Sequence, residues 1–491
     1  MIKRILKNQA IIFVILKYIA FGIQLINSLL IAKFLGFHYF GLYGFALMIL
    51  QYLSYTNFGV YYSYSVMCAD VSTKTGEQRI HITGSAITVL SISCLLLFIV
   101  YLGSYGFDLF PKYNFSEYSL WVVIIAVLQH FNNLFINIFR IHGKIGEINF
   151  YYLIVPLLQL IAVLFFRETA LFYALLYANA GGSLLSLIFF FKGFPEELKK
   201  IRIPDFSMAR IVIERGVWLL LYNLTFYGII LTARTIVSKF FSVEEFALFN
   251  FANSISNNVF LLLGTLNFLF YPKLINMISL KSDEQVIVFI EKIRKYYLTL
   301  TVLIVFISLL SLTILFYFLP QYTEAMRCLQ ILLLAQLIIN NSYGYSTLMV
   351  QRGKELQMTF IAVITIVIIV IISLISLHFF KEINTVAIAV VLGVLLYNIL
   401  VSYKGLQIIN QYTSLADFLK RVFSITLFLP IICCIALFVI NCNYYVSIIA
   451  SMLFYLLLNI KELRHIMVGG LKILSVSVEI TPNLDKESIN E

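Results

Sequence analysis

The fold of this chain is indicated by one stretch of sequence that occurs twice. The residues AKFLGFHYFGLYGFA, at positions 32–46, return 206 positions later as SKFFSVEEFALFNFA, at positions 238–252. Each copy follows an apolar run that is long enough to cross a bilayer as a helix. Because six predicted crossings separate the copies, both face the same side of the membrane, which predicts a parallel repeat about an axis along the membrane normal.

A second pair of phrases supports this repeat. IHGKIGEINF, at residues 141–150, corresponds to QRGKELQMTF, at residues 351–360, and the offset of 210 is close to that of the first pair. Two pairs in the same order at nearly the same offset predict two lobes of six helices each.

The composition is that of a membrane protein. Of the 491 residues, 61% are hydrophobic and only 12% are charged, and the mean hydropathy is +0.95. A soluble core could not bury so many apolar side chains. We therefore predict an all-α polytopic membrane protein with two six-helix lobes related by a parallel repeat and two extra C-terminal transmembrane helices, fourteen in total.

The apolar runs give both the spans and the domain organisation. The predicted spans are 10–31, 41–66, 83–103, 119–139, 149–166, 170–191, 216–236, 246–270, 297–319, 328–350, 358–380, 384–403, 422–440 and 444–460. The predicted domains are an N-lobe (1–191), a cytoplasmic linker (192–210), a C-lobe (211–403), an amphipathic linker with two further spans (404–460) and a cytoplasmic tail (461–491).

The charge balance is explained by topology. The chain has 35 Lys and Arg against 24 Asp and Glu, a net charge of +11. In a soluble protein this excess would suggest nucleic acid binding. If the N-terminus is cytoplasmic and the spans alternate, most of the basic residues fall on the cytoplasmic side. We therefore expect both termini in the cytoplasm and no nucleic acid partner.

The sequence lacks the common catalytic and metal-binding motifs. It has no GxxxxGK[ST] loop, no HExxH motif, no nucleophile elbow and no Cys/His cluster, and its six cysteines have no metal-ligand or disulfide spacing. We therefore expect a transporter rather than an enzyme, with no cofactor or metal. No Asp or Glu lies in the middle of a predicted span, which disfavours a simple cation-coupled drug exporter.

Polar residues inside the predicted spans gather on particular helices. Four of them in the fourth span share about 80° of one helical face, and three Asn in the eighth form a stripe. Because polar groups in hydrocarbon are costly, spans 1, 2, 4, 7, 8 and 10 are expected to line a polar cavity between the lobes. The candidate substrate-binding residues are Lys17, Gln24, Asn27, Gln51, Tyr55, Tyr62, His130, Asn133, Asn137, Arg140, Asn223, Arg234, Asn250, Asn253, Asn257, Arg294, Gln336 and Asn340.

Each of these assignments has a simpler alternative. Asn and Gln also join packed membrane helices through hydrogen bonds of about 0.6 kcal/mol. Lys17 lies roughly 10 Å inside the first span by helical rise, so it either reaches the cytoplasmic interface or lines the cavity as a cation for an anionic ligand. Arg234 and Arg294 lie near span ends, where anchoring at the interface is the alternative to ligand binding.

Four short motifs resemble those of a known family. AKFLGFHYFGLYGFA is similar to the A-R-x-L-G-x-x-x-F-G-x-Y signature after the first helix of polysaccharide transporters in the multidrug/oligosaccharidyl-lipid/polysaccharide (MOP) exporter superfamily. TNFG at residues 56–59 resembles the D-F-G-type turn that follows it, and YPK at residues 271–273 resembles the end of the eighth helix. HGK at residues 142–144 and RGK at residues 352–354 resemble the paired G-K turns.

Three positions depart from the family pattern. Lys33 replaces the usual Arg, Asn57 replaces the usual Asp, and Ala233 stands where the family often has Asp. The resemblance therefore leaves coupling to a proton or sodium gradient unspecified.

The resemblance implies a MATE/MOP-like fold and a Wzx-type flippase. Such a protein moves an undecaprenyl-diphosphate-linked oligosaccharide from the cytoplasmic to the periplasmic leaflet of the bacterial inner membrane, for O-antigen, lipopolysaccharide or capsule biosynthesis. Its implied partners are this substrate, membrane lipids, and the polymerase and chain-length regulator of the same pathway. Lys17 and Arg140, with Arg234 and Arg294, would serve the diphosphate or anionic sugars, while amides and tyrosines would serve sugar hydroxyls.

Two other functions stay open at this point. A MATE-like small-molecule or drug exporter would share the two-lobed plan. A membrane glycan polymerase or ligase would fit beside the same pathway, but it would be expected to have a long, Arg-rich outward loop, and this sequence has none.

Overall fold

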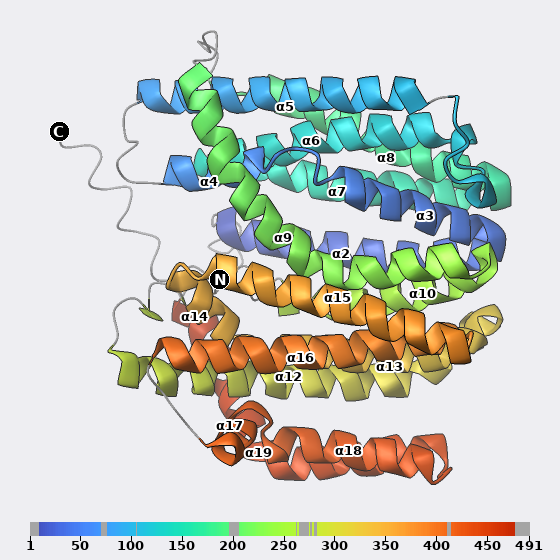
Figure 1. The fold of residues 1–491 in the computed structure, drawn as a ribbon, viewed down its shortest axis with the longest axis vertical. Helices are drawn as coiled ribbons and strands as arrows, with labels where there is room; N and C mark the ends of the chain where they lie inside the picture. Colours follow the sequence, from blue (N-terminus) through green and yellow to red (C-terminus); the bar gives the residue numbers. More distant parts are fainter. Residues whose placement is uncertain are drawn as a thin grey trace.

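The structure is a computed structural model that describes residues 9–69, 76–104, 106–195, 206–261, 263–264, 274, 277–278, 282–409 and 414–476. Within these residues the regular secondary structure is entirely helical, and most of the helices lie along one common direction (Figure 1). The prediction of an all-α membrane protein is therefore confirmed.

The first half of the chain is an array of antiparallel helices. It contains α2 (Gln9–Leu35), α3 (Phe37–Leu53), α4 (Val60–Ala69), α5 (Gly76–Ser104), the short 3-10 helices η2 (Pro111–Tyr113) and η3 (Phe115–Glu117), α6 (Ser119–Ile141), α7 (Ile145–Phe165) and α8 (Glu168–Lys192). Here α2 packs against α7, and α6 packs against α8.

The second half continues the array. It contains α9 (Phe206–Phe240), α10 (Val243–Val259), α12 (Asp283–Phe318), η5 (Pro320–Ala325), α13 (Met326–Asn340), α14 (Tyr345–Gln351), α15 (Glu355–Phe379), α16 (Ile383–Ile408), α17 (Leu415–Val422), α18 (Ile425–Val439) and α19 (Tyr444–Val476). Here α16 packs against α13 and α15.

The number of membrane crossings is less simple than the hydropathy pattern predicts. Ten described helices are long and apolar enough to cross a membrane, or up to twelve if each of two bent helix pairs is one span. Several predicted spans are broken: the second divides into α3 and α4, and the tenth into α13 and α14. Fourteen spans therefore stay a prediction, while a multi-pass membrane protein is established by the helices that qualify.

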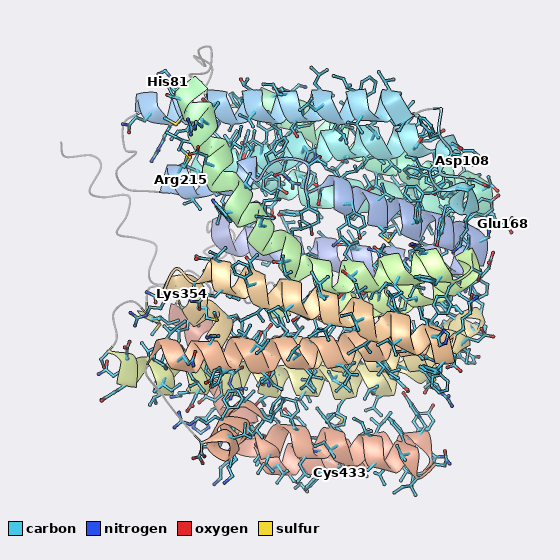
Figure 2. All side chains as sticks on the ribbon, viewed as in Figure 1. His81, Asp108, Glu168, Arg215, Lys354 and Cys433 are labelled. Atoms are coloured by element: carbon cyan, nitrogen blue, oxygen red, sulfur yellow. The ribbon has the colours of Figure 1, made fainter. Side chains whose placement is uncertain are left out.

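Loops that were predicted to face opposite sides do lie at opposite ends of the helices. Figure 2 shows Arg215 and Lys354 at one end of the molecule and Asp108 and Glu168 at the other. We call the end with Arg215 and Lys354 the inner end and the opposite one the outer end, following the predicted topology.

Both repeated phrases adopt repeated backbone structures. The first forms a tight turn at the outer end in each half, with Gly36 before α3 and Ser242 before α10 at equivalent positions. The second forms a helix end with the hydrogen bonds of a Schellman motif. Lys144 N donates to Phe139 O and Lys354 N donates to Met349 O, both at 2.9 Å. Gly143 and Gly353 supply the left-handed residue, with φ of 68° and 66°.

Helix α9 connects the two halves. It bends by 56° between Thr225 and Tyr227. The segment before the bend packs on α4 and α5 of the first half, while α15 and α10 of the second half also pack on α9 (Figure 1). At one point the backbones nearly touch, because a Cβ added to Gly59 would lie 1.9 Å from Gly216 O.

The C-terminal helices pack on the second half through α12. Tyr444 Oη donates to Leu309 O at 2.8 Å, and Tyr455 Oη donates to Thr299 O at 2.6 Å. The amphipathic helix α17 turns by 78° into α18. α18 and α19 are therefore an addition to the repeated helices, packed along one side of the array (Figure 1).

Several predictions fall on residues outside the described part. These are residues 196–205 of the linker, the YPK motif at 271–273, the end of the eighth span at 265–270 and the tail at 477–491.

Candidate functional site

A charged and polar group in the first half joins α4 to α6. Ser65 Oγ donates to Asn137 Oδ1 at 2.7 Å, and Arg140 Nη2 donates to the same Ser65 Oγ at 3.1 Å. Arg140 is exposed and Asn137 is half-buried. Because Ser65 occupies only one guanidinium nitrogen, Arg140 keeps donors for a ligand.

Lys17, on α2, lies against an aromatic side chain of α7. Its Nζ is 5.1 Å from the ring centroid of Tyr152 and 5.8 Å from that of Phe21. Tyr152, on α7, also lies within electrostatic range of Arg140. Tyr152 is therefore a shared neighbour of two cations on two helices, α2 and α6.

The predicted stripe on α6 has two different surroundings. His130 is 1% exposed, and its Nε2 lies 3.1 Å from Thr56 Oγ1 in the break between α3 and α4. Asn133 is half-buried, and its carbonyl accepts from Asn137 Nδ2 at 2.8 Å. His130 thus supports the helix break, while Asn133 and Asn137 continue towards Arg140.

Arg234 forms the centre of a second group, between the halves. Its Nη2 donates to Gly44 O at 2.9 Å and to Asn250 Oδ1 at 3.0 Å, and its Nη1 donates to Gln51 Oε1 at 3.2 Å. The residue is 7% exposed. The cost of burying this cation is offset by its hydrogen bonds to three acceptors, two of them on α3 and one on α10.

A row of amides lies in the second half. Asn257 Nδ2 donates to Asn253 Oδ1 at 3.1 Å, and Gln336 Nε2 donates to Asn257 Oδ1 at 2.5 Å. Asn340 Nδ2 donates to Gln336 O at 2.7 Å, and its Oδ1 accepts from Tyr297 Oη at 2.9 Å. The row connects α10, α13 and α12, and all but Asn253 are half-buried.

Two predicted site residues hold the structure together. Asn27 is 1% exposed, and its Nδ2 donates to Pro156 O on α7 at 2.7 Å. Arg294 is 5% exposed and donates to Asn341 Oδ1 at 3.0 Å and to Val422 O at 2.8 Å. It also bonds Arg421 O. Because Arg294 occupies the end of α17, we leave it out of the candidate site.

The other predicted residues are less informative. Gln24 is exposed on α2, Asn223 donates to Leu219 O of its own helix at 2.8 Å, and Tyr55 is half-buried between α3 and α4. The Tyr62 ring lies 4.6 Å from that of Tyr61. Tyr55 adjoins the Arg234 group, because its hydroxyl bonds the Gln51 side chain. The structure therefore brings most candidates into two cationic groups and one amide row. Gln24, Asn223, Tyr62 and the two structural residues lie outside them.

Sequence reasoning missed a pair of tyrosines at the outer end. Tyr113 Oη donates to Ser238 O at the end of α9, at 2.9 Å. Its ring stacks on Phe45 of its own half, with centroids 3.9 Å apart, and contacts Phe246 of the other half edge-on at 5.8 Å. Lys112 Nζ also bonds Ser238 O, at 2.7 Å.

Tyr322 repeats this arrangement from the second half. Its Oη donates to Ala32 O at the end of α2, at 3.1 Å. Its ring stacks on Phe251 at 4.2 Å and contacts Phe40 edge-on at 5.6 Å. The signal was present in the sequence, since PKY at 111–113 and PQY at 320–322 are related by an offset of 209.

The outer end carries further contacts between the halves, and one of them is an ion pair. His38 Nδ1, on α3, donates to Glu244 Oε1 at the start of α10, at 3.1 Å. The backbone N–H of Glu244 itself and the contact with His38 hold the pKa of this carboxyl below its usual range. The pair is about half exposed, so it adds little to stability.

Comparison with solved structures identifies the fold. An inward-facing MATE-family multidrug resistance transporter of the MOP superfamily matches with a TM-score of 0.65 and 14% identity, over 80% of this chain and 94% of its own. A lipid II flippase, MurJ, in an inward closed conformation matches with a TM-score of 0.58 and 14% identity, over 93% of this chain and 100% of its own. A MATE structure in complex with MaL6 matches with a TM-score of 0.59 and 15% identity, over 81% and 95%.

These likenesses show a MATE/MOP-like fold, as the sequence motifs predict. No family model matches the chain, and no curated protein matches it. At these identities the comparisons define the fold and leave the cargo to be argued from the site.

Proposed function

We propose that this protein is a flippase that moves an undecaprenyl-diphosphate-linked oligosaccharide from the cytoplasmic to the periplasmic leaflet of the bacterial inner membrane. The observations that carry the proposal are that Lys17 lies against the Tyr152 ring and that Arg140 is within electrostatic range of the same tyrosine. Two cations from different membrane helices that share one neighbour suit a ligand with two adjacent negative charges, such as a diphosphate.

The amide row supports a sugar as the rest of the cargo. Asn257, Gln336 and Asn340 are half-buried and carry both donors and acceptors. Sugar hydroxyls need both kinds of partner, whereas an apolar drug needs neither. The two cations would hold the diphosphate while the amides receive the oligosaccharide.

Closure at the outer end supports alternating access. Contacts between the halves there include those of Tyr113, Tyr322 and Arg234. A rocking motion of the two lobes would break these contacts and expose the site to the opposite side. The protein would work beside the polymerase and chain-length regulator of a surface polysaccharide pathway.

A drug exporter is the second candidate, because MATE transporters are among the structural neighbours. The absence of Asp and Glu from the middle of the predicted spans argues against it. The neighbour described as a lipid II flippase supports the first candidate, since the same fold there serves a lipid cargo.

Deletion of the gene in its host tests the proposal. We expect loss of surface polysaccharide together with accumulation of complete, single lipid-linked units on the cytoplasmic leaflet. Intact surface polysaccharide would reject the flippase role, and a new sensitivity to small toxic molecules would instead support a drug exporter.

Point substitutions test the site within the deletion strain. Lys17→Gln and Arg140→Gln are expected to abolish surface polysaccharide at a normal protein level, whereas Lys17→Arg and Arg140→Lys should retain part of it. Arg215→Gln is the matched control, because Arg215 is an exposed cation at the inner end. Normal polysaccharide in the Lys17→Gln/Arg140→Gln double variant would reject these residues as the diphosphate site.

A further inference from the structure

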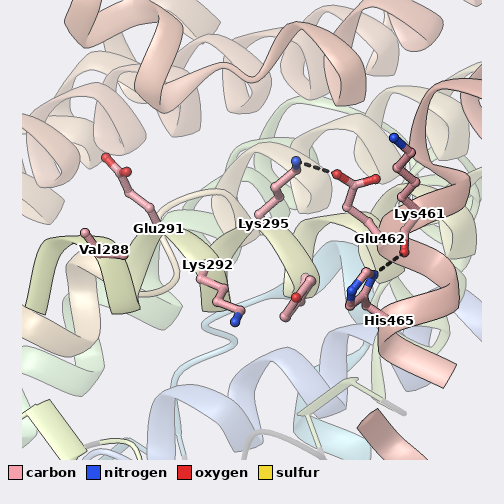
Figure 3. Close-up of a pocket in the computed structure, with 8 residues that line it drawn as sticks. Val288, Glu291, Lys292, Lys295, Lys461, Glu462 and His465 are labelled. Atoms are coloured by element: carbon pink, nitrogen blue, oxygen red, sulfur yellow. Dashed lines mark hydrogen bonds and ion pairs between the residues drawn. The ribbon is translucent and has the colours of Figure 1, made fainter. Parts of the chain in front are cut away.

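A pocket lies between α12 and α19 at the inner end, away from the polar groups described above. Its volume is about 490 Å³. Its walls are Val288, Glu291, Lys292, Lys295 and Tyr296 from α12 and Lys461, Glu462 and His465 from α19 (Figure 3).

The pocket exists because both helices extend beyond the apolar part of their spans. α12 has 36 residues, or about 54 Å by helical rise, against the roughly 30 Å of a hydrocarbon core. α19 leaves helical geometry at Asn459, where φ is −119° and ψ is 17°. Asn459 Nδ2 donates to Thr426 O at 2.8 Å, which ties this kink to α18.

Both carboxylates of the pocket already have cationic partners. Lys295 Nζ lies 2.6 Å from Glu462 Oε1, which joins α12 to α19. Arg421 Nη1 lies 3.6 Å from Glu291 Oε1. These two pairs fix the walls of the pocket and neutralise its negative charges.

Two further lysines of the pocket take no part in these ion pairs, so their positive charge is not neutralised. Lys292 and Lys461 are exposed, and within the described residues neither has a carboxylate at ion-pair distance. His465 Nδ1 donates to Lys461 O at 2.8 Å, which fixes the ring against the pocket wall (Figure 3). The pocket therefore has a net positive charge and walls that are held in place.

The position of the pocket relative to the membrane indicates which kind of anion it would bind. The predicted spans on these helices are 297–319 and 444–460, so the pocket residues follow directly at the ends of two apolar segments. Val288, at the rim, is 66% exposed, and Tyr296 is a residue type that favours the membrane interface. A site at this level of the membrane, with two exposed lysines and an exposed apolar side chain, suits an amphiphile with a phosphate headgroup.

We propose that this pocket binds the phosphate headgroup of an anionic phospholipid of the leaflet at the inner end. Lys292 of α12 and Lys461 of α19, which lie on opposite sides of the pocket (Figure 3), supply the positive charge that attracts the headgroup, and the acyl chains leave past Val288. The bound lipid thereby holds the extended end of α19 against α12. This site is separate from the cargo site, so it stands whether or not the protein flips a lipid-linked sugar.

The experiment is a lipid-dependent stability measurement on the purified full-length protein in a neutral detergent. Thermal unfolding is followed with added phosphatidylglycerol, cardiolipin, phosphatidylcholine or inorganic phosphate. The test variant is Lys292→Gln/Lys461→Gln. The matched control is Lys239→Gln/Lys381→Gln, which removes two exposed lysines elsewhere on the chain.

Anionic lipids are expected to raise the Tm of the wild type and of the control but not that of the test variant. Native mass spectrometry should show phosphatidylglycerol retained roughly twenty-five-fold less by the test variant, since each of the two lysines contributes about a factor of five near an anionic surface. The single variants Lys292→Gln and Lys461→Gln give the same readout if the double variant does not fold.

Two results would overturn the proposal. An equal Tm shift in the test variant and the control would mean that anionic lipid acts elsewhere on the protein. A shift with inorganic phosphate as large as that with phosphatidylglycerol would mean that the pocket is a site for free phosphate rather than for a lipid.

Discussion

Tyr113 and Tyr322 occupy equivalent positions in the two repeats, and each donates a hydrogen bond to the half of the protein to which it does not belong. Their acceptors, Ser238 O and Ala32 O, are themselves equivalent through the offset of 206. The two halves thus make the same contact twice at the outer end, once in each direction. Opening the outer end requires both to break.

Replacing both tyrosines by phenylalanine is expected to favour opening at the outer end. A net hydrogen bond contributes about 1 kcal/mol, so Tyr113→Phe/Tyr322→Phe should shift the equilibrium by about 2 kcal/mol, or roughly thirty-fold. The rings and their stacking remain. The measurement is the distance distribution between spin labels at Ser116 and Lys381, both exposed, in a background without reactive cysteines.

The control for this experiment is Tyr317→Phe. Tyr317 is 81% exposed and directly precedes the same loop, so the loss of its hydroxyl should leave the distances unchanged. Each single variant should produce about half of the free-energy shift. A double variant with wild-type distances would show that the tyrosine hydroxyls do not hold the outer end closed.

Arg234→Lys is expected to impair transport although it keeps the positive charge. An ammonium group cannot satisfy Gly44 O, Gln51 Oε1 and Asn250 Oδ1 with the planar geometry of a guanidinium. We expect a fall of at least tenfold in surface polysaccharide and a Tm lowered by a few degrees. Arg215→Lys, at an exposed position, should change neither. Full activity of Arg234→Lys would mean that charge alone matters at this site.

The helices and the repeats could be predicted because their signals are local. Apolar length specifies a membrane helix, and Gly143 and Gly353 mark equivalent helix ends through a left-handed φ that glycine favours. The break between α13 and α14 was not predicted, since residues 328–350 read as one apolar run. Its local signs are Gly344, with φ of 91°, and the turn-forming residues Asn340, Asn341 and Ser342 before it.

The roles of individual polar residues depend on tertiary contacts that the sequence does not contain. Arg294 bonds Val422 O, 128 residues away, and Asn27 bonds Pro156 O, 129 residues away. A polar side chain in a span shows that a partner is needed but not which one. Lys17 and Arg140 were singled out from the sequence as candidate ligand cations, and their common neighbour Tyr152 emerged only from the fold.

Substitutions should separate the structural arginine from the candidate ligand cations. Arg294→Gln leaves carbonyls of α17 without a donor at a buried position, so we expect a Tm lower by several degrees and reduced protein in the membrane. Arg140→Gln removes an exposed guanidinium whose contact is a serine hydroxyl, so its Tm should stay within about a degree of the wild type while transport is lost. Equal Tm losses in the two variants would place Arg140 among the structural residues.

The contact between α4 and α9 can be tested at three glycines. Gly59 has φ of 73°, and an added Cβ would lie 1.9 Å from Gly216 O, whereas Gly36 has φ of 75° with no atom within 4 Å of the added Cβ. Gly36→Ala therefore introduces backbone strain alone, about 1–3 kcal/mol, because φ of 75° and ψ of 161° lie in a region that almost only glycine adopts. Gly59→Ala adds a backbone clash that can be relieved only by moving α9 away from α4.

We expect Gly36→Ala to be folded and active with a slightly lower Tm, and Gly59→Ala to lose most of its transport activity. Gly216→Ala, whose Cβ would lie 2.5 Å from Phe58 O without any positive φ, measures the clash alone and should resemble Gly59→Ala. Size-exclusion profiles of detergent extracts and surface polysaccharide levels give the comparison. If Gly216→Ala keeps wild-type activity and Gly59→Ala is no worse than Gly36→Ala, close packing of α9 on α4 is not needed for transport, because strain alone would then account for the whole effect at Gly59.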